Sequence, residues 1–268
     1  NKKKALKIVD FTKKERPVIV QVFGYDADIV AKAIEIIVKE LKPDGIDINL
    51  GCPAPKIVRN MCGSAFLKDH NKAFELVKKI RESFSGQLSV KTRLGIKGFE
   101  VLPLLKKFEE ISINAITIHG RTVDQKYSGK ADWDTIHKIA KSLKIPVILN
   151  GDITNWNDAY AEISKSSIKG IMMSRVCIQK PWIFKEIKKK KEIKLKPNQL
   201  ASFLKEHTRY YLKYDSRKAF IEMRKFYPGY LRGLVNSKEL RKLAMEVKNQ
   251  KDFNNLINNI KKSKWLRN

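Results

Sequence analysis

Six short apolar runs, rich in β-branched residues, alternate with segments of helical periodicity along the first two thirds of the chain. The runs are VIVQVFG (18–24), GIDINLG (45–51), LSVKTRLG (88–95), AITIHGR (115–121), PVILNGD (146–152) and GIMMSRV (170–176). Helical spacing is clear at 31–41, 73–83, 102–111, 133–142 and 155–164, and Asn155 is a candidate N-cap. Strands that alternate with helices pair in parallel, so the pattern predicts a closed barrel or an open doubly wound sheet.

The polar residues at the ends of these runs distinguish the two folds. Each run has one near its end: Gln21, Asn49, Lys91, His119, Asn150 and Arg175. An open sheet gathers ligands at one switch point, whereas a barrel directs all of its strand C-termini to one site. Six such ends favour a TIM-type (β/α)8 barrel. The loops NGD (150–152) and SR (174–175) combine a glycine with an arginine, which indicates a phosphate pocket.

The number of runs is two short of the eight strands that such a barrel contains. The segment before Val18 has no room for two strands, and the chain begins with Asn1. The sequence therefore predicts a barrel that lacks its first two strands in this chain. Open sheet edges are prone to association, so we expect residues 1–268 alone to be poorly soluble.

A different composition begins after residue 184. The charge run EIKKKKEIKLKP (186–197) has no apolar periodicity and reads as a linker. Helical spacing then recurs at 198–214, 217–234, 238–248 and 252–262, which predicts a small helical bundle. The predicted domains are therefore residues 1–184 and residues 185–268. Aromatic residues stand among the basic ones of this bundle, where core packing and stacking on bases are both open roles: Tyr210, Tyr211, Tyr214, Phe226, Tyr227 and Tyr230.

The charge of the chain indicates a polyanionic partner. The sequence has 56 Lys and Arg against 28 Asp and Glu, a net charge of +28. Residues 185–268 carry 24 basic and 8 acidic side chains, whereas residues 1–184 carry 32 and 20. The codon bias of an AT-rich genome would explain many lysines, but not their twofold excess over acids. Nucleic acid is the expected partner, and the last third is expected to hold it.

Cysteine content and hydropathy limit the other classes of protein. Cys52, Cys62 and Cys177 are an odd number in no zinc-like spacing, so we expect reduced thiols in a cytoplasmic protein. A metal site built from Cys52, Cys62 and His70 has the wrong spacing. No apolar run approaches the roughly 18 residues of a membrane span. We expect a monomer that binds no membrane and no metal.

The block INLGCPAPKIVRNMCGSAFLKD (48–69) resembles the signature of the tRNA-dihydrouridine synthases, and GCPAPK with GSA is most similar to their bacterial B-type branch. The resemblance extends through VQVFG (20–24), VKTRLG (90–95), TIHGRTVDQKYSGKADW (117–133), NGDI (150–153), SRVCIQKPWIF (174–184) and MRKFYPGYLRG (223–233). It implies an FMN-containing barrel, reduced by NADPH, that saturates the C5–C6 bond of particular uridines in tRNA.

The same resemblance implies roles for individual residues. Cys52 matches the catalytic acid and Asn49 the residue beside substrate and flavin. Contacts to the flavin ring and ribityl chain are implied for Gln21, Lys91 and His119, and a phosphate cradle for Asn150, Gly151, Asp152, Ser174 and Arg175. The chain lacks the family's opening Ala-Pro-Met-Ala-Gly-like turn, and Ser174 and Phe226 replace a common Gly and His. We therefore expect residues 1–268 alone to bind FMN weakly.

The chemistry of uridine reduction explains why a cysteine suits the site. Hydride addition at C6 builds negative charge toward C5 and O4, so a proton donor must face the opposite side of the ring. A thiol with a pKa of about 8.5 is mostly protonated at pH 7 and can act as this acid. The alternative for Cys52 is a buried structural thiol. Lys91 is either paired with the flavin ring or with a structural acid, because an unpaired buried ammonium is costly.

The sequence is compatible with three functions. The chain is a flavin-dependent tRNA-uridine reductase, an inactive RNA-binding remnant, or a flavin barrel that oxidises or reduces a small molecule. The basic tail counts against the third. A reductase would have to extrude its uridine from the folded tRNA, because flavin and thiol need both faces of the base. No motif indicates which uridines are modified or which nicotinamide is used.

Overall fold

The computed structural model describes residues 6–215 and 218–265 and divides the chain into two compact units. The first is formed by residues 1–153 and 161–172, and the second by residues 154–160 and 173–268. The long continuous part of the second unit thus begins at residue 173, twelve residues before residue 185, where the second domain was predicted to begin. That boundary stays a prediction.

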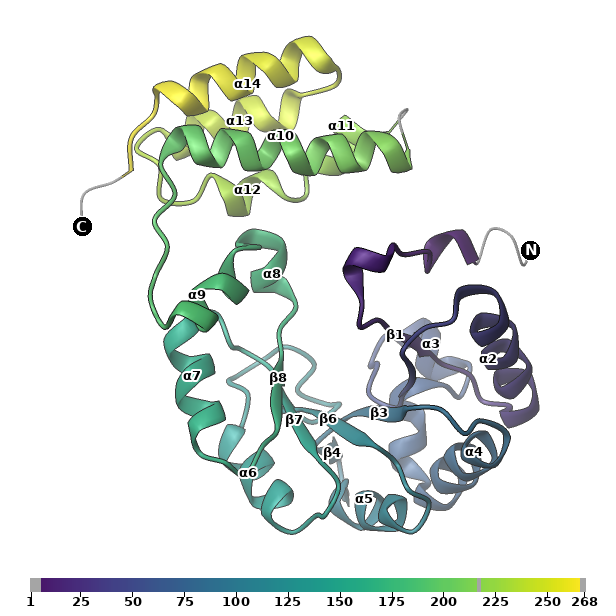
Figure 1. Ribbon diagram of the computed structural model, residues 1–268. Coiled ribbons are helices and arrows are strands. Elements are labelled where there is room, and N and C mark those ends of the chain that lie inside the picture. Colours follow the sequence, from purple (N-terminus) through teal and green to yellow (C-terminus); the bar gives the residue numbers. More distant parts are fainter. Residues whose placement is uncertain (1–5, 216–217, 266–268) are drawn as a thin grey trace. The chain divides into compact units, whose positions relative to one another are not determined.

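The first unit contains one parallel sheet with the strand order β1-β2-β3-β6-β7-β8. Its strands are β1 (Ile19–Val22), β2 (Gly45–Asn49), β3 (Leu88–Arg93), β6 (Ala115–His119), β7 (Val147–Asn150) and β8 (Gly170–Met172). Every neighbouring pair is parallel. The strands curl into a half-barrel with helices along its outer side (Figure 1). The predicted TIM-type barrel architecture is confirmed.

The helices that follow the strands begin at capping residues. They are α2 (Ala27–Leu41), α4 (His70–Ser83), α5 (Leu102–Glu109), α6 (Trp133–Lys141) and α7 (Trp156–Ser164). Asp26 caps α2 and Asp69 caps α4, so both helices begin earlier than their apolar spacing predicts. Asn155 accepts a hydrogen bond from the backbone N–H of Asp158, which confirms it as the cap of α7.

The two faces of the sheet differ because side chains alternate along each strand. Ile48, Ile118 and Leu149 face the helices and are at most 1% exposed. Their strand neighbours Asn49 and His119 point to the inner face. Register partners on parallel strands point the same way, so the polar residues of the separate strands lie side by side on that face.

Several short elements escape prediction because they hold at most six residues, too few for a pattern to repeat clearly. They are the 3-10 turns η1 (Lys13–Glu15) and η2 (Gly63–Lys68), the helix α3 (Pro55–Arg59), and the antiparallel hairpin of β4 (Gly95–Ile96) and β5 (Phe99–Glu100). The run GIMMSRV was predicted to continue as a strand to Val176. Strand β8 ends at Met172 and a helix begins at Arg175, so its last residues are not strand.

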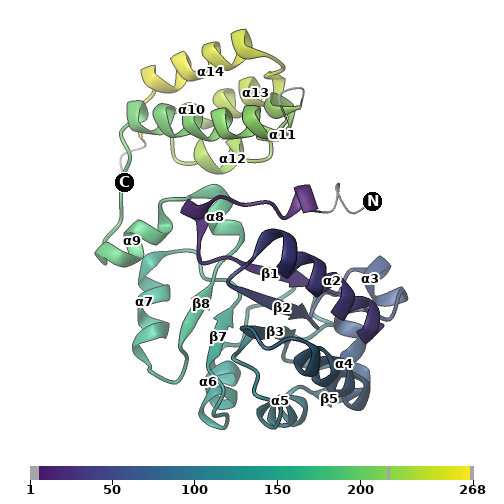
Figure 2. The ribbon, with the colours of Figure 1, turned by 45° about the vertical axis from the view of Figure 1, so that its right-hand side comes forward.

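The second unit is helical (Figure 2). It contains α8 (Arg175–Gln179), α9 (Ile183–Lys189), α10 (Pro197–Tyr214), α11 (Ala219–Met223), α12 (Tyr227–Tyr230), α13 (Ser237–Glu246) and α14 (Gln250–Lys262). Leu204, Tyr227 and Leu256 belong to its core. The helical bundle is confirmed, but the single helix predicted at 217–234 is two short helices, and its first residue lies outside the described residues. Glu186, predicted in a linker, is buried in α9 and paired with Lys180 at 2.8 Å.

Replacing Ile118 by alanine tests the apolar face of the sheet. The side chain is fully buried, so Ile118→Ala should lower the free energy of unfolding by about 2–5 kcal/mol through lost burial and the cavity left behind. Ile29→Ala in α2 is the control, because Ile29 is 61% exposed and its loss should cost no more than about 0.5 kcal/mol. Urea unfolding measures both, and equal effects would contradict the assigned faces.

Candidate active site on the inner face of the sheet

The register of the sheet places polar side chains in three layers along the inner face. Gln21, Asp47 and Ser89 are register partners in the first layer. Asn49, Lys91 and Thr117 form the second layer, and Arg93, His119 and Asn150 form the third. The structure therefore brings the predicted residues Gln21, Asn49, Lys91, His119 and Asn150 to one face, with Cys52 in the turn that follows β2.

A chain of hydrogen bonds fixes the turn that carries Cys52. The backbone N–H groups of Gly51 and Cys52 donate to Oδ1 of Asn49 at 3.0 and 2.9 Å. Asn49 Nδ2 donates to Gln21 Oε1 at 2.8 Å, and Gln21 Nε2 donates to Asp47 Oδ2 at 2.7 Å. Because the oxygen of Asn49 is committed to the turn, its amide group can offer a substrate only its second N–H.

Glycines on either side allow this turn to lie close to its neighbours. A Cβ atom added to Gly51 would lie 3.0 Å from the backbone carbon of Thr92 in β3. Gly63 has a φ of +59°, and a Cβ atom there would lie 3.0 Å from the carbonyl oxygen of Cys52. That carbonyl accepts a hydrogen bond from the N–H of Ser64. The turn is therefore held from both sides.

Cys52, the predicted acid, lies in the turn that follows β2. It is half-buried and belongs to no disulfide. Cys62, by contrast, is buried, its Sγ donates to the carbonyl of Asn60, and burial raises the pKa of its thiol. Burial also raises the pKa of Cys177. Cys177 is half-buried like Cys52 but lies within α8, whereas Cys52 lies in the turn that Asn49 holds at the end of β2.

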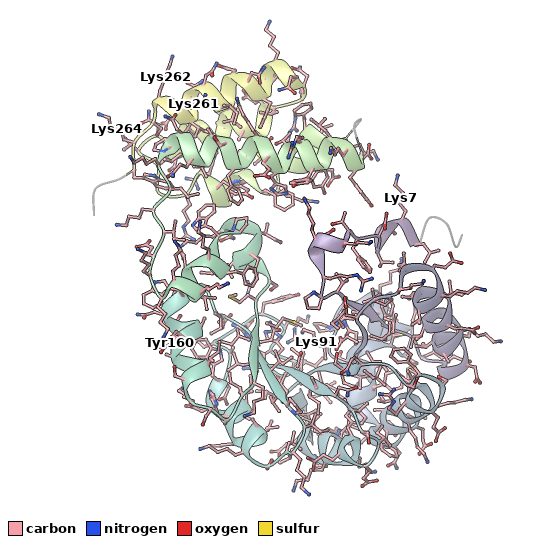
Figure 3. All side chains as sticks on the ribbon, viewed as in Figure 1. Lys7, Lys91, Tyr160, Lys261, Lys262 and Lys264 are labelled. Carbon is pink, nitrogen blue, oxygen red and sulfur yellow. The ribbon has the colours of Figure 1, made fainter. Side chains whose placement is uncertain are left out.

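Lys91 presents a cation to the inner face, and Figure 3 shows it among the side chains of the sheet. Within the described residues, its ammonium group makes no hydrogen bond and no ion pair. Burial lowers the pKa of Lys91, while the nearby carboxylate of Asp47 raises it. Burial in turn raises the pKa of Asp47. The predicted alternative, a structural ion pair, is therefore not formed as a direct contact.

His119 is a neutral imidazole at neutral pH. It is buried, and burial together with the charges of Arg93, Lys91 and Arg121 lowers its pKa to about 4. Arg121 NH1 lies 3.4 Å from His119 Nε2. Arginine can only donate, so Nε2 is the accepting nitrogen and Nδ1 carries the proton.

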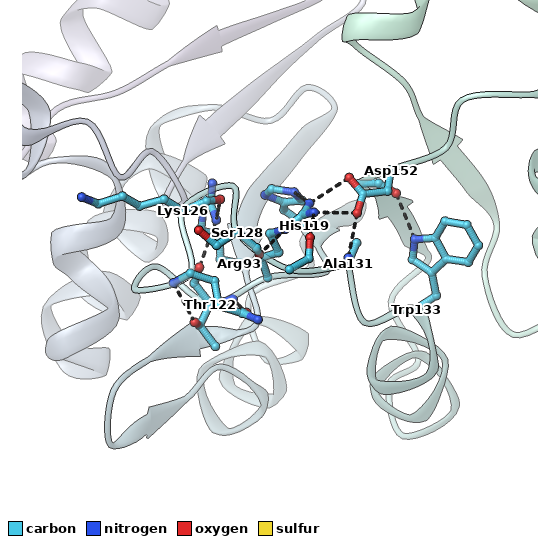
Figure 4. Close-up of polar contacts among 12 residues, drawn as sticks. Arg93, His119, Thr122, Lys126, Ser128, Ala131, Trp133 and Asp152 are labelled. Carbon is cyan, nitrogen blue, oxygen red and sulfur yellow. Dashed lines mark hydrogen bonds and ion pairs between the residues drawn. The ribbon is translucent and has the colours of Figure 1, made fainter.

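Asp152 and Gly151 shape the end of β7 (Figure 4). Both oxygens of Asp152 accept from Arg121, at 2.9 and 2.6 Å, and one of them also accepts from the N–H of Ala131. Gly151 has a φ of +118°, and a Cβ atom there would lie 2.8 Å from the ring of His119. The glycine is needed at this position, because any side chain would be strained and would displace His119.

The residues predicted for the phosphate cradle belong to different units. Asn150 donates to the carbonyl of Met172 at 2.8 Å in the first unit. Ser174 is the N-cap residue of α8 and makes no side-chain capping bond, and Arg175 is the first residue of that helix. Both belong to the second unit. A cradle that includes Ser174 and Arg175 stays a prediction.

Asp47, Arg93 and Arg121 were not predicted as site residues. Asp47 lies two positions before Asn49, and Arg93 two positions after Lys91. The alternation of strand side chains therefore contained a signal for both, since residues two apart face the same side. Arg121 also lies two positions after a predicted residue, His119, but β6 ends at His119, so the alternation of the strand does not extend to Arg121. Its buried contact with Asp152 appears only in three dimensions.

Some of the six aromatic residues singled out in the second unit are exposed. Tyr227 and Tyr230 are buried in the core, and Tyr211 and Phe226 pack against it. Tyr210 is 57% exposed and Tyr214 is 53% exposed, and the guanidinium carbon of Arg209 lies 5.4 Å from the Tyr210 ring. Lysines also stand on the outside of this unit (Figure 3): Lys261, Lys262 and Lys264. Two of the six predicted aromatics are therefore exposed enough to stack on bases.

The part of the chain that the structure describes contains neither a candidate metal site nor a candidate membrane span. Residues 6–215 and 218–265 contain no cluster of three His, Cys, Asp or Glu side chains arranged to hold a metal ion. None of the helices in these ranges is long and apolar enough to cross a membrane.

Comparisons with known proteins give one consistent family. Residues 1–265 match the family model described as dihydrouridine synthase. A probable tRNA-dihydrouridine synthase of Aquifex aeolicus is 34% identical over 265 residues, which cover 97% of this chain and 84% of the relative. A probable tRNA-dihydrouridine synthase of Rickettsia conorii is 37% identical, with 83% and 69% covered. The tRNA-dihydrouridine synthase B of Pasteurella multocida is 32% identical, with 87% and 72% covered.

The neutral state of His119 predicts a pH dependence of stability. Its pKa is about 4 in the folded chain against 6.5 in the reference state, so between these values the unfolded chain binds more protons. The free energy of unfolding therefore falls as the pH falls from 6.5 to 4, and His119 contributes at most about 3 kcal/mol to that fall. His119→Gln should flatten the profile in this window. Urea unfolding at a series of pH values measures it, and parallel profiles would contradict the assignment.

Proposed function

This chain belongs to the dihydrouridine synthase family, and we propose that it reduces specific uridines in tRNA to 5,6-dihydrouridine, with FMN as its bound flavin and NADPH as the reductant. The observation that carries the proposal is the placement of Cys52. Its turn is fixed by Asn49 on the inner face of the sheet, where the Lys91 ammonium group has no partner within the described residues.

The inner face suits a flavin in its charge and its backbone. Lys91, Arg93 and His119 line neighbouring strands, and a cation without a partner is suited to the N1–C2–O2 edge of the ring, which becomes negative on reduction. Gly151 keeps the end of β7 free of a side chain. When bound, FMN would supply the hydride for C6 of the uracil ring.

The residues of the chain supply the remaining parts of the reaction. The thiol of Cys52 donates its proton to C5, so that one hydride and one proton together saturate the C5–C6 bond. The second N–H of the Asn49 amide is available to a uracil carbonyl, because the oxygen of that amide is held by the Cys52 turn. Asn49 thus orients the base relative to the acid that protonates it.

The second unit supports an RNA substrate. Residues 185–268 carry a net charge of +16, and Tyr210 and Tyr214 are exposed on α10. Lys and Arg side chains bind phosphates without regard to sequence, and exposed tyrosines stack on unpaired bases. Binding of tRNA should therefore weaken as the salt concentration rises. Salt-independent affinity would favour a small-molecule substrate instead.

Lys91→Met tests the flavin site directly. Methionine keeps the length of the side chain but removes its charge. The loss of a charge-assisted hydrogen bond of about 1.5–3 kcal/mol should weaken FMN binding by about 10- to 100-fold. Fluorescence titration of the apoprotein with FMN measures the affinity. Lys39→Met, on the exposed end of α2, is the control and should bind FMN as the wild type does. Equal affinities for the two variants would remove Lys91 from the site.

Cys52→Ala tests the acid and the reaction together. The protein is produced in a bacterial host without dihydrouridine synthases of its own, and dihydrouridine in purified tRNA is quantified by mass spectrometry. Loss of the general acid should slow the reaction by about 10²- to 10⁴-fold. Cys177→Ala is the matched control and should leave dihydrouridine at the wild-type level. Wild-type protein that holds FMN but forms no dihydrouridine would contradict the proposed substrate, and protein that binds RNA without FMN would favour the inactive remnant.

A further inference from the structure

Arg93, the last residue of β3, is a buried arginine whose hydrogen bonds all run to backbone carbonyls. Only 3% of it is exposed. Its Nε donates to the carbonyl of Gly51 at 2.9 Å, and its NH1 donates to the carbonyls of Thr122 at 3.0 Å and Lys126 at 2.9 Å. Within the described residues, no carboxylate pairs with it. The hydrogen bonds of this guanidinium group therefore hold the segments that supply the carbonyls, and they do not neutralise its charge.

The first of those segments is the turn that carries the proposed acid. Gly51 directly precedes Cys52, and its backbone lies against that of Thr92, the residue before Arg93. Asn49 holds the N–H groups of this turn, whereas Arg93 holds its Gly51 carbonyl. The two side chains together therefore satisfy both the N–H groups and a carbonyl group of the turn.

The second segment is the loop 120–132, which contains several internal hydrogen bonds (Figure 4). The N–H of Asp132 donates to the carbonyl of Gly120 at 2.6 Å and so joins the ends of the loop. Inside it, Arg121 donates to the carbonyls of Ser128 at 3.1 Å and Gly129 at 2.6 Å. These hydrogen bonds brace the loop from within, and Arg93 connects it to the Cys52 turn.

We propose that Arg93 is a positioning residue, which ties the Cys52 turn to the loop 120–132 and thereby sets the place from which Cys52 delivers its proton. The part of this proposal that concerns proton delivery rests on the proposed function, whereas the tie itself does not. Only arginine offers several N–H donors in a rigid plane that reach carbonyls of two segments at once. Lysine keeps the charge but is a flexible point donor, so Arg93→Lys should loosen the tie.

The chain offers a matched control in Arg81. Its guanidinium group also donates to two backbone carbonyls, those of Phe84 and Gly86. These carbonyls lie just before β3, so Arg81 is near the first residue of this strand, whereas Arg93 is its last residue. Arg81→Lys loses the same kind of hydrogen bond, but at the end of β3 that lies away from the Cys52 turn. It should lower stability while leaving the Cys52 turn as it is.

The first experiment needs neither flavin nor tRNA turnover. The alkylation rate of Cys52 by iodoacetamide is measured by peptide mass spectrometry, and hydrogen exchange is measured across residues 120–132. Arg93→Lys should change the alkylation rate at least threefold and speed exchange in the loop, whereas Arg81→Lys should change neither. Unchanged alkylation and exchange in a folded Arg93→Lys variant would overturn the proposal.

The second experiment separates positioning from stability in the reaction. Arg93→Lys should lower kcat at least tenfold while KM for tRNA stays within about threefold, and methylguanidinium should restore part of the kcat of Arg93→Ala while methylammonium should not. A drop in melting temperature equal to that of Arg81→Lys, with kcat retained, would overturn the proposal. If the wild type forms no dihydrouridine, the proposed function fails, and the first experiment still decides the tie.

Folding of the variants is itself an outcome. Arg93→Gln removes the buried charge and keeps an amide donor, so it should fold even where Arg93→Lys does not, with the same change in Cys52 alkylation. If Arg93→Lys and Arg93→Gln both fail to fold while Arg81→Lys folds, Arg93 is required for stability alone and the proposal is overturned.

Discussion

The parallel register of the sheet is the constraint on which the site depends. Each strand alternates between an apolar residue that packs under helices and a polar residue that faces inward, as Ile48 and Asn49 do. A slip of one residue would bury Asn49 under the helices and turn Ile48 inward. Burial of the isoleucines and leucines therefore stabilises the fold and, through the same register, aligns Asn49, Lys91 and His119.

The inner face has an excess of positive charge that the acidic residues in the described part of the chain balance only in part. Arg121 is paired with Asp152, and Asp47 lies near Lys91. Arg93 is satisfied by carbonyl oxygens, which accept hydrogen bonds but carry no net charge. Burial, together with the surrounding cations, lowers the pKa of His119 and keeps the ring neutral. Such a surface favours an anionic partner, and a reduced flavin or a phosphate would meet that need.

The sequence predicted most of this arrangement because its main signals are local. Strand runs and their polar ends identified Gln21, Asn49, Lys91, His119 and Asn150, and the cysteine after Asn49 followed from the family signature. What it could not show are contacts between distant segments. Arg93 binds carbonyls about 30 to 40 residues away, and backbone carbonyls have no sequence identity to detect. The early starts of α2 and α4 were missed because the apolar spacing begins after the capping aspartates.

A crystal structure of the protein with bound FMN decides whether the inner face is the active site, because it locates the flavin relative to that face. The flavin ring should lie against β2, β3 and β6, with Lys91 Nζ within about 3.2 Å of N1 or O2 and Cys52 facing the same cavity. A flavin bound elsewhere, with Lys91 and Cys52 directed away from it, would contradict the assignment of this face as the active site.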